Sequence, residues 1–482
     1  MRKFLYLFSA VLLGFSTFSC GSDNNDNPDD PNPGNVTLST RSCTYGDNKT
    51  LSGAEIDANT VKSFTVTYSS TVTINPSVAI TLNGASVSAS ISPTTSMSII
   101  IPVTLQSGTN YTLTIPEGAI VRSDNSKVSA PAYSVSFSTI KDTSVDPSTV
   151  VTSLINPNAT QQAKNVYNFL RENYGKKQLS GAMGGVAWEL TFCDFIKKEA
   201  GHFPAIAGFD YIHLAWSPDN WINYGDITPV KTAWDMNCIP AMTWHWNVAP
   251  KEGGDIKNDG TCSPDETEFQ PKNVLVDGTW ENKVWNDDVK KLAGYISLLQ
   301  DAGIPVLWRP FHEAAGDFTW GAWFWWGKDG VEVTKQLWVK LHDELTNTYG
   351  LNNLIWVWTM CTSDQGKLAS IDKVKASYPG DEYVDIVGAD LYPDKVYSDQ
   401  SAQFNLINSV VEGKKIVTLS EVGNLVSVES AVKSNTLWSY FMCWYDYDGK
   451  DYDFKQWNNA EVWKTIMDDP NVINQEDMPS LK

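Results

Sequence analysis

Short apolar runs alternate with longer amphipathic stretches through residues 150–482. The apolar runs lack strict polar alternation, as expected for parallel strands that are covered on both faces. Eight strands are expected, at 177–184, 203–211, 239–246, 304–313, 354–360, 384–393, 415–423 and 438–446. Helices are predicted between them, at 286–303, 334–350, 401–413 and 460–469. This repeating pattern predicts an α/β fold of the (β/α)8 TIM-barrel type with long loops.

Residues 36–141 follow a different pattern, in which apolar and polar positions alternate. The alternation runs through 63–70, 79–91, 110–121 and 132–140, and turn residues separate these runs, which is typical of a small all-β antiparallel sandwich. The segment resembles a bacterial Ig-like domain. A spacer role is favoured for it over a carbohydrate-binding module, because it has few aromatic residues that could contact sugar: Phe64, Tyr68, Tyr111 and Tyr133.

The first 35 residues are expected to be an export signal followed by a flexible tether. Residues 1–19 begin with two basic residues and continue as an apolar run that ends before Cys20, as in a secretory signal peptide. The junction resembles a bacterial lipoprotein signal, which implies lipidation of Cys20, and a plain secreted protein is the alternative. Residues 20–35 are polar and acidic, predict a flexible tether, and resemble the surface-export signal of Bacteroidetes-type lipoproteins. We therefore expect a protein anchored in the outer membrane and exposed at the cell surface.

The amino-acid composition limits the classes of molecule that the protein is expected to bind. The chain has 36 Lys and Arg against 56 Asp and Glu, a net charge of −20, which argues against nucleic-acid binding but not against a neutral polysaccharide. The membrane is expected to be a partner only through the lipid anchor, with other glycan-uptake surface proteins as further candidates. The seven cysteines contain no CxxC pair, so no zinc module is predicted, and their disulfide pairing stays open. No metal or organic cofactor is expected.

Polar and aromatic residues close several of the predicted strands. In a TIM barrel the reactive side chains lie at the carboxyl ends of the strands, where the βα loops meet. The candidates that fall there are His245, Trp246, Arg309, His312, Glu313, Asp390, Tyr392, Glu421 and Trp444.

Two of these candidates, Glu313 and Glu421, close the fourth and seventh strands, which face each other across the barrel mouth. Glycoside hydrolysis needs two carboxyl groups that flank one bond, one protonated and one ionised. A single Glu at a strand end would more simply cap a helix or pair with Arg. Two of them at these strands, with a Trp-rich loop between them, favour the catalytic interpretation.

The stretch RPFHEAAGDFTWGAWFWWG at 309–327 resembles the acid/base motif of glycoside hydrolase family 26, whose members are best known as β-mannanases. The resemblance covers residues 150–482 and implies that Glu313 is the acid/base and that Glu421, in LSEVG, is the nucleophile. It also implies that His245, His312, Asp390, Tyr392 and Trp444 line the −1 subsite. Arg309 is expected to contact substrate and to orient the site electrostatically. About five residues, DFTWG, are inserted before WFWWG relative to the family pattern, so either Trp320 or Trp323 could stack on a sugar.

All 20 tryptophans lie at or after Trp188. A pyranose presents an apolar C–H face that can stack on an indole ring. Substrate contact is expected for the tryptophans at strand ends or in loops, which are Trp246, Trp323, Trp326 and Trp444. A core position is expected for those inside helix or strand patterns, which are Trp338, Trp356 and Trp463.

The sequence thus predicts a retaining endo-β-1,4-mannanase that hydrolyses β-mannan, glucomannan or galactomannan by double displacement. Alternatives within the family are an exo-acting mannobiohydrolase, a β-1,3-xylanase and a mixed-linkage glucanase. An alternative of another class is a surface glycan-binding protein without turnover.

Overall fold

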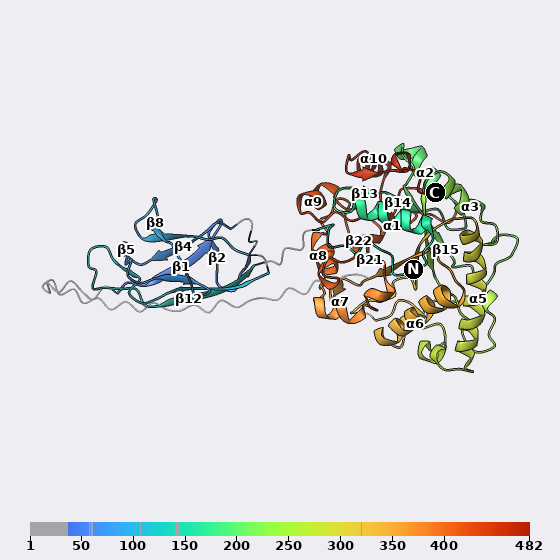
Figure 1. Cartoon of the computed structure of the whole chain (residues 1–482), viewed down its shortest axis with the longest axis horizontal. Helices are drawn as coiled ribbons and strands as arrows, with labels where there is room; N and C mark the ends of the chain where they lie inside the picture. Colours follow the sequence, from blue (N-terminus) through green and yellow to red (C-terminus); the bar gives the residue numbers. More distant parts are fainter. Residues whose placement is uncertain (1–36, 57, 59–60, 107, 140–144, 320) are drawn as a thin grey trace. The chain divides into compact units, whose positions relative to one another are not determined.

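The computed structural model describes residues 37–56, 58, 61–106, 108–139, 145–319 and 321–482 (Figure 1). The chain divides into two compact units, Met1–Asp142 and Thr143–Lys482. The predicted signal peptide, Cys20 and the tether at 20–35 lie outside the described residues. In the described ranges, no helix combines the length and the apolar character that crossing a bilayer requires.

The first unit is a small all-β domain. Its strands are β1 (Thr40–Tyr45), β2 (Lys49–Thr50), β3 (Glu55–Ile56), β4 (Ser63–Tyr68), β5 (Val72–Ile74), β6 (Ile80–Leu82), β7 (Ala85–Val87), β8 (Ser90–Ile91), β9 (Ser98–Pro102), β10 (Asn110–Ile115), β11 (Ile120–Arg122) and β12 (Tyr133–Thr139). They form two five-stranded sheets, in the orders β2-β1-β4-β9-β8 and β3-β12-β10-β6-β7, together with the pair β11-β5.

The period-two pattern of the first unit decides which side chains are buried. Alternate residues of β4, namely Phe64, Val66 and Tyr68, are buried, and the ring of Phe64 meets that of Phe137 edge-on with centroids 5.1 Å apart. Tyr111 is also buried. Most of the few aromatic residues of this unit therefore fill its core instead of offering a surface to a sugar.

The second unit is a closed barrel of eight parallel strands, which confirms the predicted TIM barrel. Around the barrel they are β14 (Gly181–Met183), β15 (Ile206–Asp210), β16 (Ile239–Trp244), β17 (Val306–Pro310), β18 (Leu354–Thr359), β21 (Ile386–Leu391), β22 (Ile416–Val422) and β23 (Phe441–Cys443). Each falls inside one of the eight apolar runs of the sequence. Most of their residues are buried because helices cover the outer face and barrel side chains fill the interior.

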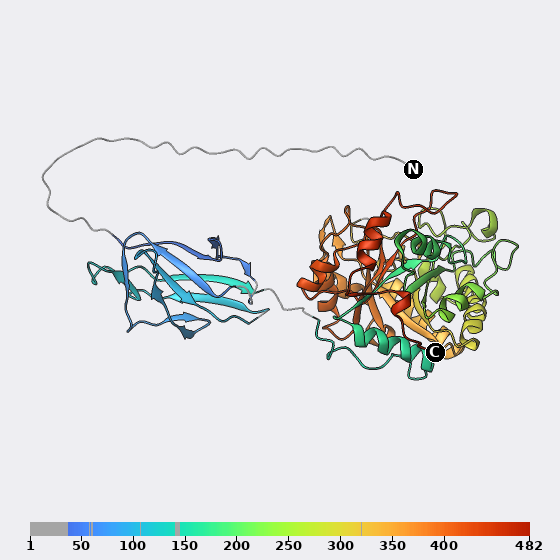
Figure 2. The ribbon, with the colours of Figure 1, turned by 90° about the horizontal axis from the view of Figure 1, so that it is seen from above.

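Helices surround these strands (Figures 1 and 2). They are α1 (Gln161–Asn173), α2 (Thr191–Ala200), α3 (Thr228–Asp235), α4 (Ile256–Asp259), α5 (Trp280–Asp301), α6 (Val331–Asp343), α7 (Ile371–Ser377), α8 (Ser401–Val410), α9 (Val428–Lys433) and α10 (Ala460–Met467). Short strands outside the barrel are β13 (Gln178–Leu179) paired with β24 (Val472–Ile473), and the hairpin β19 (Ser363–Asp364) with β20 (Lys367–Leu368).

Local capping fixes where the helices begin. The α5 helix starts at Trp280, six residues before the predicted start at 286, because the Thr279 side chain accepts a hydrogen bond from the backbone of Asn282. Asn459 caps α10 in the same way. The helices α1, α2 and α3, which were not predicted, are short amphipathic segments whose apolar faces pack on the barrel.

Candidate active site

The ends of three barrel strands bring a cation and two carboxylates together. Arg309 lies near the end of β17, Asp390 near the end of β21 and Glu421 near the end of β22. The pairing of β21 with β22 shifts by one residue after Ala389, so Asp390 lies opposite Glu421 and Ser420 is the extra residue. Such bulges re-aim side chains, and this one turns Glu421 towards the same point as Asp390.

Both carboxylate oxygens of the buried Glu421 have polar partners. Its Oε2 accepts a hydrogen bond from Nη2 of Arg309 at 2.6 Å, and its Oε1 accepts one from the Tyr392 hydroxyl. Arg309 Nη1 lies 2.5 Å from Oδ2 of Asp390, and the Ser420 hydroxyl donates to the other oxygen of Asp390 at 2.8 Å. This network holds the Glu421 carboxylate in one orientation at the barrel mouth.

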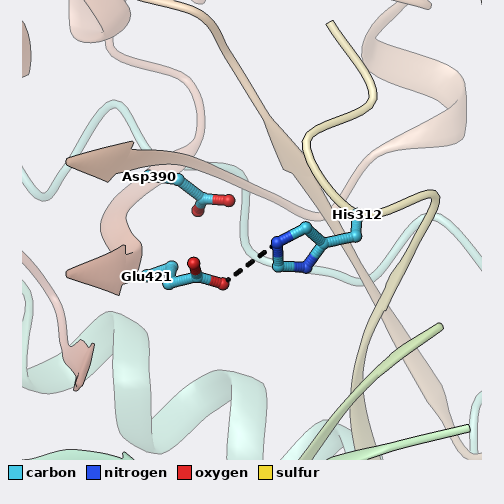
Figure 3. Close-up of side chains that lie close together, drawn as sticks. All are labelled: His312, Asp390 and Glu421. Atoms are coloured by element: carbon cyan, nitrogen blue, oxygen red, sulfur yellow. Dashed lines mark ion pairs between the residues drawn. The ribbon is translucent and has the colours of Figure 1, made fainter. Parts of the chain in front are cut away.

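His312 completes the surroundings of Glu421. Its Nε2 lies 3.4 Å from Oε2 of Glu421, the contact drawn in Figure 3. Nη2 of Arg309 lies 3.1 Å from Nδ1 of His312, and since guanidinium can only donate, Nδ1 must be the acceptor. The proton therefore sits on Nε2, which faces Glu421. Burial, and then the charges of His245 and Arg309, hold the pKa of His312 well below its ordinary value, so the ring is neutral.

His245 packs on His312 with ring centroids 3.8 Å apart, and Asp210 at the end of β15 orients it. Oδ2 of Asp210 lies 2.5 Å from Nδ1 of His245, and the other oxygen accepts the backbone N–H of the same residue at 3.1 Å. Burial acts to raise the pKa of Asp210, but the charge and hydrogen bonds of His245 outweigh it and lower this pKa. The half-buried ring of Trp444 meets both histidines edge-on.

Glu313 is presented by an unusual backbone. Phe311 and Glu313 both have positive φ, at 52° and 47°, a left-handed conformation that costs a residue with a side chain about 1–2 kcal/mol. Phe311 is buried among Trp246, Trp285 and Trp326, so the packing can hold this turn. The result is that His312 points to Glu421 while Glu313 reaches a cavity.

That cavity has a volume of about 240 Å³ and lies over β17, β18 and β21. Glu313, Asp390 and Tyr392 form its inner side. Its outer side includes Asp317 and Trp323, the latter 48% exposed. The remaining wall is the segment 359–363, which follows β18. Of the two candidate stacking residues in the inserted loop, Trp323 thus lines the cavity, and Trp320 lies outside the described residues.

The two glutamates differ in their electrostatic surroundings. Burial, and next the charge of Asp390, raise the pKa of Glu313 to about 7. Burial and Asp390 also raise the pKa of Glu421, to about 8, while Arg309 and the Tyr392 hydroxyl act to lower it. The charge of Glu313 is one of the influences that raise the pKa of Glu421, so protonating Glu313 favours ionised Glu421. The two carboxyl groups therefore hold one proton between them near neutral pH, and Glu421 is ionised when that proton lies on Glu313.

The structure corrects three of the expected substrate contacts. Trp246 and Trp326 are each 1% exposed, so neither ring offers a face to a sugar. Trp246 stacks on Trp244 and donates to Asp288, while Trp326 donates to the backbone oxygen of His312. The side chain of Arg309 is also buried, and its guanidinium group forms ion pairs with Asp390 and Glu421. All three support the site from within the protein, because indole and guanidinium donors here satisfy buried acceptors.

The remaining aromatic residues were predicted either to contact substrate or to lie in the core. Trp323, Tyr392 and Trp444 are partly or well exposed around the carboxyl groups. Trp338, Trp356 and Trp463 are buried, as their positions inside helix and strand patterns indicated.

Replacing Trp326 with alanine is expected to destabilise the fold more than to change a single subsite. Removing a fully buried indole costs about 3–5 kcal/mol, and chemical denaturation would measure this loss as a lower free energy of unfolding. Trp323→Ala is the matched control, because Trp323 is exposed; its free energy of unfolding should change by less than about 0.5 kcal/mol. Equal stability losses in both variants would contradict this assignment.

Two residues that the sequence argument passed over contribute to the site. Asp210 closes the second strand and orients His245, and its position at a strand end was a usable signal. Ser420 reaches Asp390 only because of the bulge in β22, for which the sequence carries no clear signal.

The described residues include one group with metal-ligating geometry, His312, Asp390 and Glu421, whose ligand atoms lie within 4.8 Å of one another. Arg309 already contacts all three of these side chains. The guanidinium supplies the positive charge that a cation would bring, so we interpret the group as a hydrogen-bonded network. All six cysteines of the described part of the chain are free thiols.

Two carboxyl groups at the mouth of a TIM barrel are the arrangement that glycoside hydrolases of this fold use. The sequence profile of glycosyl hydrolase family 26 matches residues 155–477, and the chain belongs to this family.

Relatives and solved structures agree with this assignment. A mannan endo-1,4-beta-mannosidase B from Piromyces sp is 35% identical over 340 residues, which cover 68% of this chain and 54% of the relative. The chain thus spans about half the length of that relative. The GH26 domain of an endo-beta-mannanase/endo-beta-glucanase from Prevotella bryantii has 37% identity and a TM-score of 0.62, covering 68% of this chain and 99% of the domain. A beta-mannanase from a symbiotic protist of the termite Reticulitermes speratus, solved with a gluco-manno-oligosaccharide, has 32% identity and a TM-score of 0.58, covering 69% of this chain and 98% of that one.

Proposed function

We propose that this protein is a retaining endo-β-1,4-mannanase in which Glu313 is the acid/base and Glu421 the nucleophile. The observation that carries the proposal is the contrast between the two carboxyl groups. Glu313 lines an open cavity, whereas Glu421 is buried and held by Arg309 and Tyr392.

In the first step, Glu421 attacks the anomeric carbon while Glu313 gives its proton to the glycosidic oxygen. The bond to the leaving sugar breaks, and a covalent glycosyl ester forms on Glu421. Only one oxygen of Glu421 can attack; Tyr392 donates to Oε1, and Arg309 and His312 contact Oε2. These donors hold the carboxylate in place, and Arg309 offsets its charge.

In the second step, Glu313, now ionised, takes a proton from water, which attacks the same carbon and releases Glu421. Two inversions leave the β configuration unchanged. His245 and Trp444, which lie beside His312, are positioned to contact the sugar that Glu421 carries. No step needs a metal ion or an organic cofactor.

The substrate class is supported by the names of the relatives, several of which are mannan endo-1,4-beta-mannosidases. It is tested with a panel of soluble polysaccharides assayed for new reducing ends. We expect release of manno-oligosaccharides of several lengths from galactomannan and glucomannan. Mannobiose as the sole early product would favour an exo mode, and cleavage confined to β-1,3-xylan or mixed-linkage glucan would replace the proposed specificity. Binding without any hydrolysis would favour a glycan-binding protein.

The activity should follow a bell-shaped pH profile whose alkaline limb belongs to Glu313. Burial raises the pKa values of both carboxyl groups, that of Glu313 to about 7 and that of Glu421 to about 8, so the single proton that the pair needs for acid catalysis is lost as the pH rises through this range. The acid limb reflects uptake of a second proton by the pair, which leaves no ionised carboxylate to attack. Initial rates of mannan hydrolysis between pH 4 and about 10 test this expectation; constant rates from neutrality upward would exclude Glu313 as the acid.

We also propose that the protein is exported and anchored through lipidated Cys20, that residues 20–35 tether it at the cell surface, and that the all-β unit is an Ig-like spacer. The two five-stranded sheets with buried aromatic residues support the spacer. Cell-surface glycan-uptake proteins are the partners that this location would bring near.

Replacing Cys20 with serine removes the thiol that the acyl chains require, so the full-length protein should move from the membrane fraction to the soluble fraction. Immunoblots of fractionated cells measure this change. Cys43→Ser is the control, since Cys43 is buried in the all-β unit. Unchanged membrane association of the Cys20 variant would exclude the lipid anchor.

A further inference from the structure

The tyrosine that donates to the nucleophile is only partly enclosed. Tyr392 follows β21, and its hydroxyl donates to Oε1 of Glu421, yet the residue is 42% exposed where it lines the cavity beside Glu313. A tyrosine ring turns about two side-chain torsions, so its hydroxyl is directed at one oxygen only if the ring is held. The contacts that hold this ring therefore bear on the reaction.

Trp457 packs on the ring of Tyr392. The two ring centroids are 5.1 Å apart, and the ring planes are inclined by 60°. Trp457 lies in the segment 444–459, which joins β23 to α10, so a loop from the eighth strand reaches the residue that follows the sixth. Nε1 of Trp457 has no hydrogen-bond partner within the described part of the chain. Packing, and not a hydrogen bond of the ring, therefore orients this indole.

Gly423 leaves room for both rings. A Cβ atom at Gly423 would lie 2.7 Å from Cδ1 of Tyr392 and 3.0 Å from Cε3 of Trp457, which is closer than van der Waals contact allows. The backbone N–H of Gly423 also donates to the backbone oxygen of Leu391, next to Tyr392, at 3.1 Å. The two rings therefore close over bare backbone two residues after the nucleophile.

Two buried polar side chains fix the backbone around Trp457. Oδ2 of Asp446 accepts two consecutive backbone N–H groups, the second of which is that of Trp457 at 3.2 Å. Asn458 donates to the backbone oxygen of Gly423 at 2.8 Å and accepts the backbone N–H of Leu425 at 2.8 Å. The indole is thus anchored to the end of β22, the strand that carries the nucleophile.

We propose that Trp457 is a positioning residue, which together with Gly423 holds the phenol ring of Tyr392 so that its hydroxyl donates to Oε1 of Glu421. The inference rests on the proposed function, in which Glu421 attacks the sugar. Since Trp457 acts through Tyr392, removing the indole should affect the reaction in the same way as removing the hydroxyl.

Trp457 reaches the titratable groups around Glu421 through Tyr392. Burial, Asp390 and Glu313 raise the pKa of Glu421, whereas Arg309 and the hydrogen bond from Tyr392 act to lower it. Breaking that hydrogen bond raises the pKa of Glu421 further, so the pair of carboxyl groups takes up its second proton at a higher pH. The groups that face Glu421 from the ends of β17, β21 and β23 are Arg309, His312, Glu313, Asp390, Tyr392, Cys443 and Tyr445.

The test compares wild type with Tyr392→Phe, Trp457→Ala and Gly423→Ala on galactomannan. Tyr392→Phe removes the hydroxyl, and because a hydrogen bond to a charged acceptor is among the strong ones, kcat should fall about 10- to 30-fold. Trp457→Ala frees the ring and Gly423→Ala crowds it, so both should lose kcat by a similar factor, with KM within about threefold of wild type. In all three variants the acid limb of the pH profile should move up by about half a pH unit or more. Trp457→Phe keeps a ring against Tyr392 and should restore most of the loss.

A double variant separates positioning from other roles. Adding Trp457→Ala to Tyr392→Phe should lower kcat by less than about twofold, because the hydroxyl that Trp457 directs is already gone. Losses that multiply would overturn the proposal while leaving the proposed function intact. Phe454→Ala is the matched control, because Phe454 is a half-buried aromatic residue of the same loop that packs on Phe195 and Trp463, with ring centroids 4.7 and 6.4 Å away. It should lose stability with kcat and the acid limb unchanged; an equal shift of the acid limb in this variant would assign the effect to a loosened loop and overturn the proposal.

A crystal structure of Trp457→Ala tests the geometry without any hydrolysis, so it decides the matter even if wild type hydrolyses no polysaccharide and the proposed function fails. The Tyr392 hydroxyl should no longer lie within hydrogen-bond distance of Oε1 of Glu421. An unchanged hydrogen bond would overturn the positioning role, whatever the activity. Trp457→Leu takes the place of Trp457→Ala in each measurement if the alanine variant does not fold, with the same expected results.

Discussion

Glu421→Ala is expected to lower kcat on mannan by about 10⁴-fold or more, because Glu421 supplies the oxygen that forms the glycosyl ester. Glu421 lies on β22 with its carboxylate bound by Arg309 and Tyr392, so the variant loses both the attacking atom and the charge that these donors stabilise. Reducing-end release on galactomannan measures the loss. Glu429→Ala is the control, since Glu429 is an exposed carboxylate on α9 that pairs with Lys433, and it should retain wild-type rates.

Added azide separates a lost nucleophile from a damaged fold. The space left by the carboxylate can admit azide, which would attack the anomeric carbon of an aryl β-mannoside once and give the α-mannosyl azide. Partial recovery of rate with that product is the expected result. A Glu421→Ala enzyme that retains near-normal hydrolysis would remove Glu421 from this role.

Glu313→Ala is expected to have an effect that depends on the leaving group. General acid catalysis contributes about 10²–10⁴-fold, so hydrolysis of mannan, which releases a poorly acidic sugar hydroxyl, should fall by about that factor. A dinitrophenyl β-mannoside needs no protonation when it leaves, so its first step should remain fast and the glycosyl ester on Glu421 should accumulate as a burst. Azide should then speed turnover and give the β-mannosyl azide.

The contrast between the two azide products is the internal control, because each variant predicts the opposite anomer. An equal loss of rate on mannan and on the dinitrophenyl substrate would mean that Glu313 does not act as the acid. Gln is a useful second replacement at this position, since it nearly preserves the volume of the side chain and the turn at φ 47° that Glu313 adopts.

The barrel could be predicted from the sequence because its strands are short and apolar on both faces. Runs such as 415–423 match β22 within one residue at each end. The shorter helices were missed because capping and tertiary contacts define them more than periodicity does; α9, with six residues, is too short to show a hydrophobic face by pattern alone.

The sequence predicted which residues form the site but not how their side chains are arranged. Polar residues at strand ends pointed to Glu313, Glu421 and Asp390, but the alignment of Asp390 with Glu421 depends on the bulge at Ser420. The local sequence carries no clear signal for that bulge.

The exposure of individual tryptophans was equally hard to predict from the sequence. Trp326 is adjacent to Trp325 in a loop, where exposure was the reasonable expectation, yet it donates to His312 from within the core. Both residues lie in a 3-10 helix, Trp325–Gly327, which folds back on the barrel and is too short for its hydrophobic period to be read from the sequence. Conversely, Trp221 lies in a loop without a catalytic motif, and its exposure appears only in three dimensions.

The account depends most on the claim that Glu421 becomes covalently attached to the sugar while Glu313 serves as its acid and base. The most direct measurement is mass-spectrometric peptide mapping after inactivation with 2-deoxy-2-fluoro-β-mannosyl fluoride or its mannobiosyl homologue, whose glycosyl ester forms and then hydrolyses slowly. The account predicts one fluorosugar on the peptide that contains Glu421, while all other peptides remain unmodified. Label on Glu313, or hydrolysis of mannan to α-configured products without any trapped ester, would contradict it.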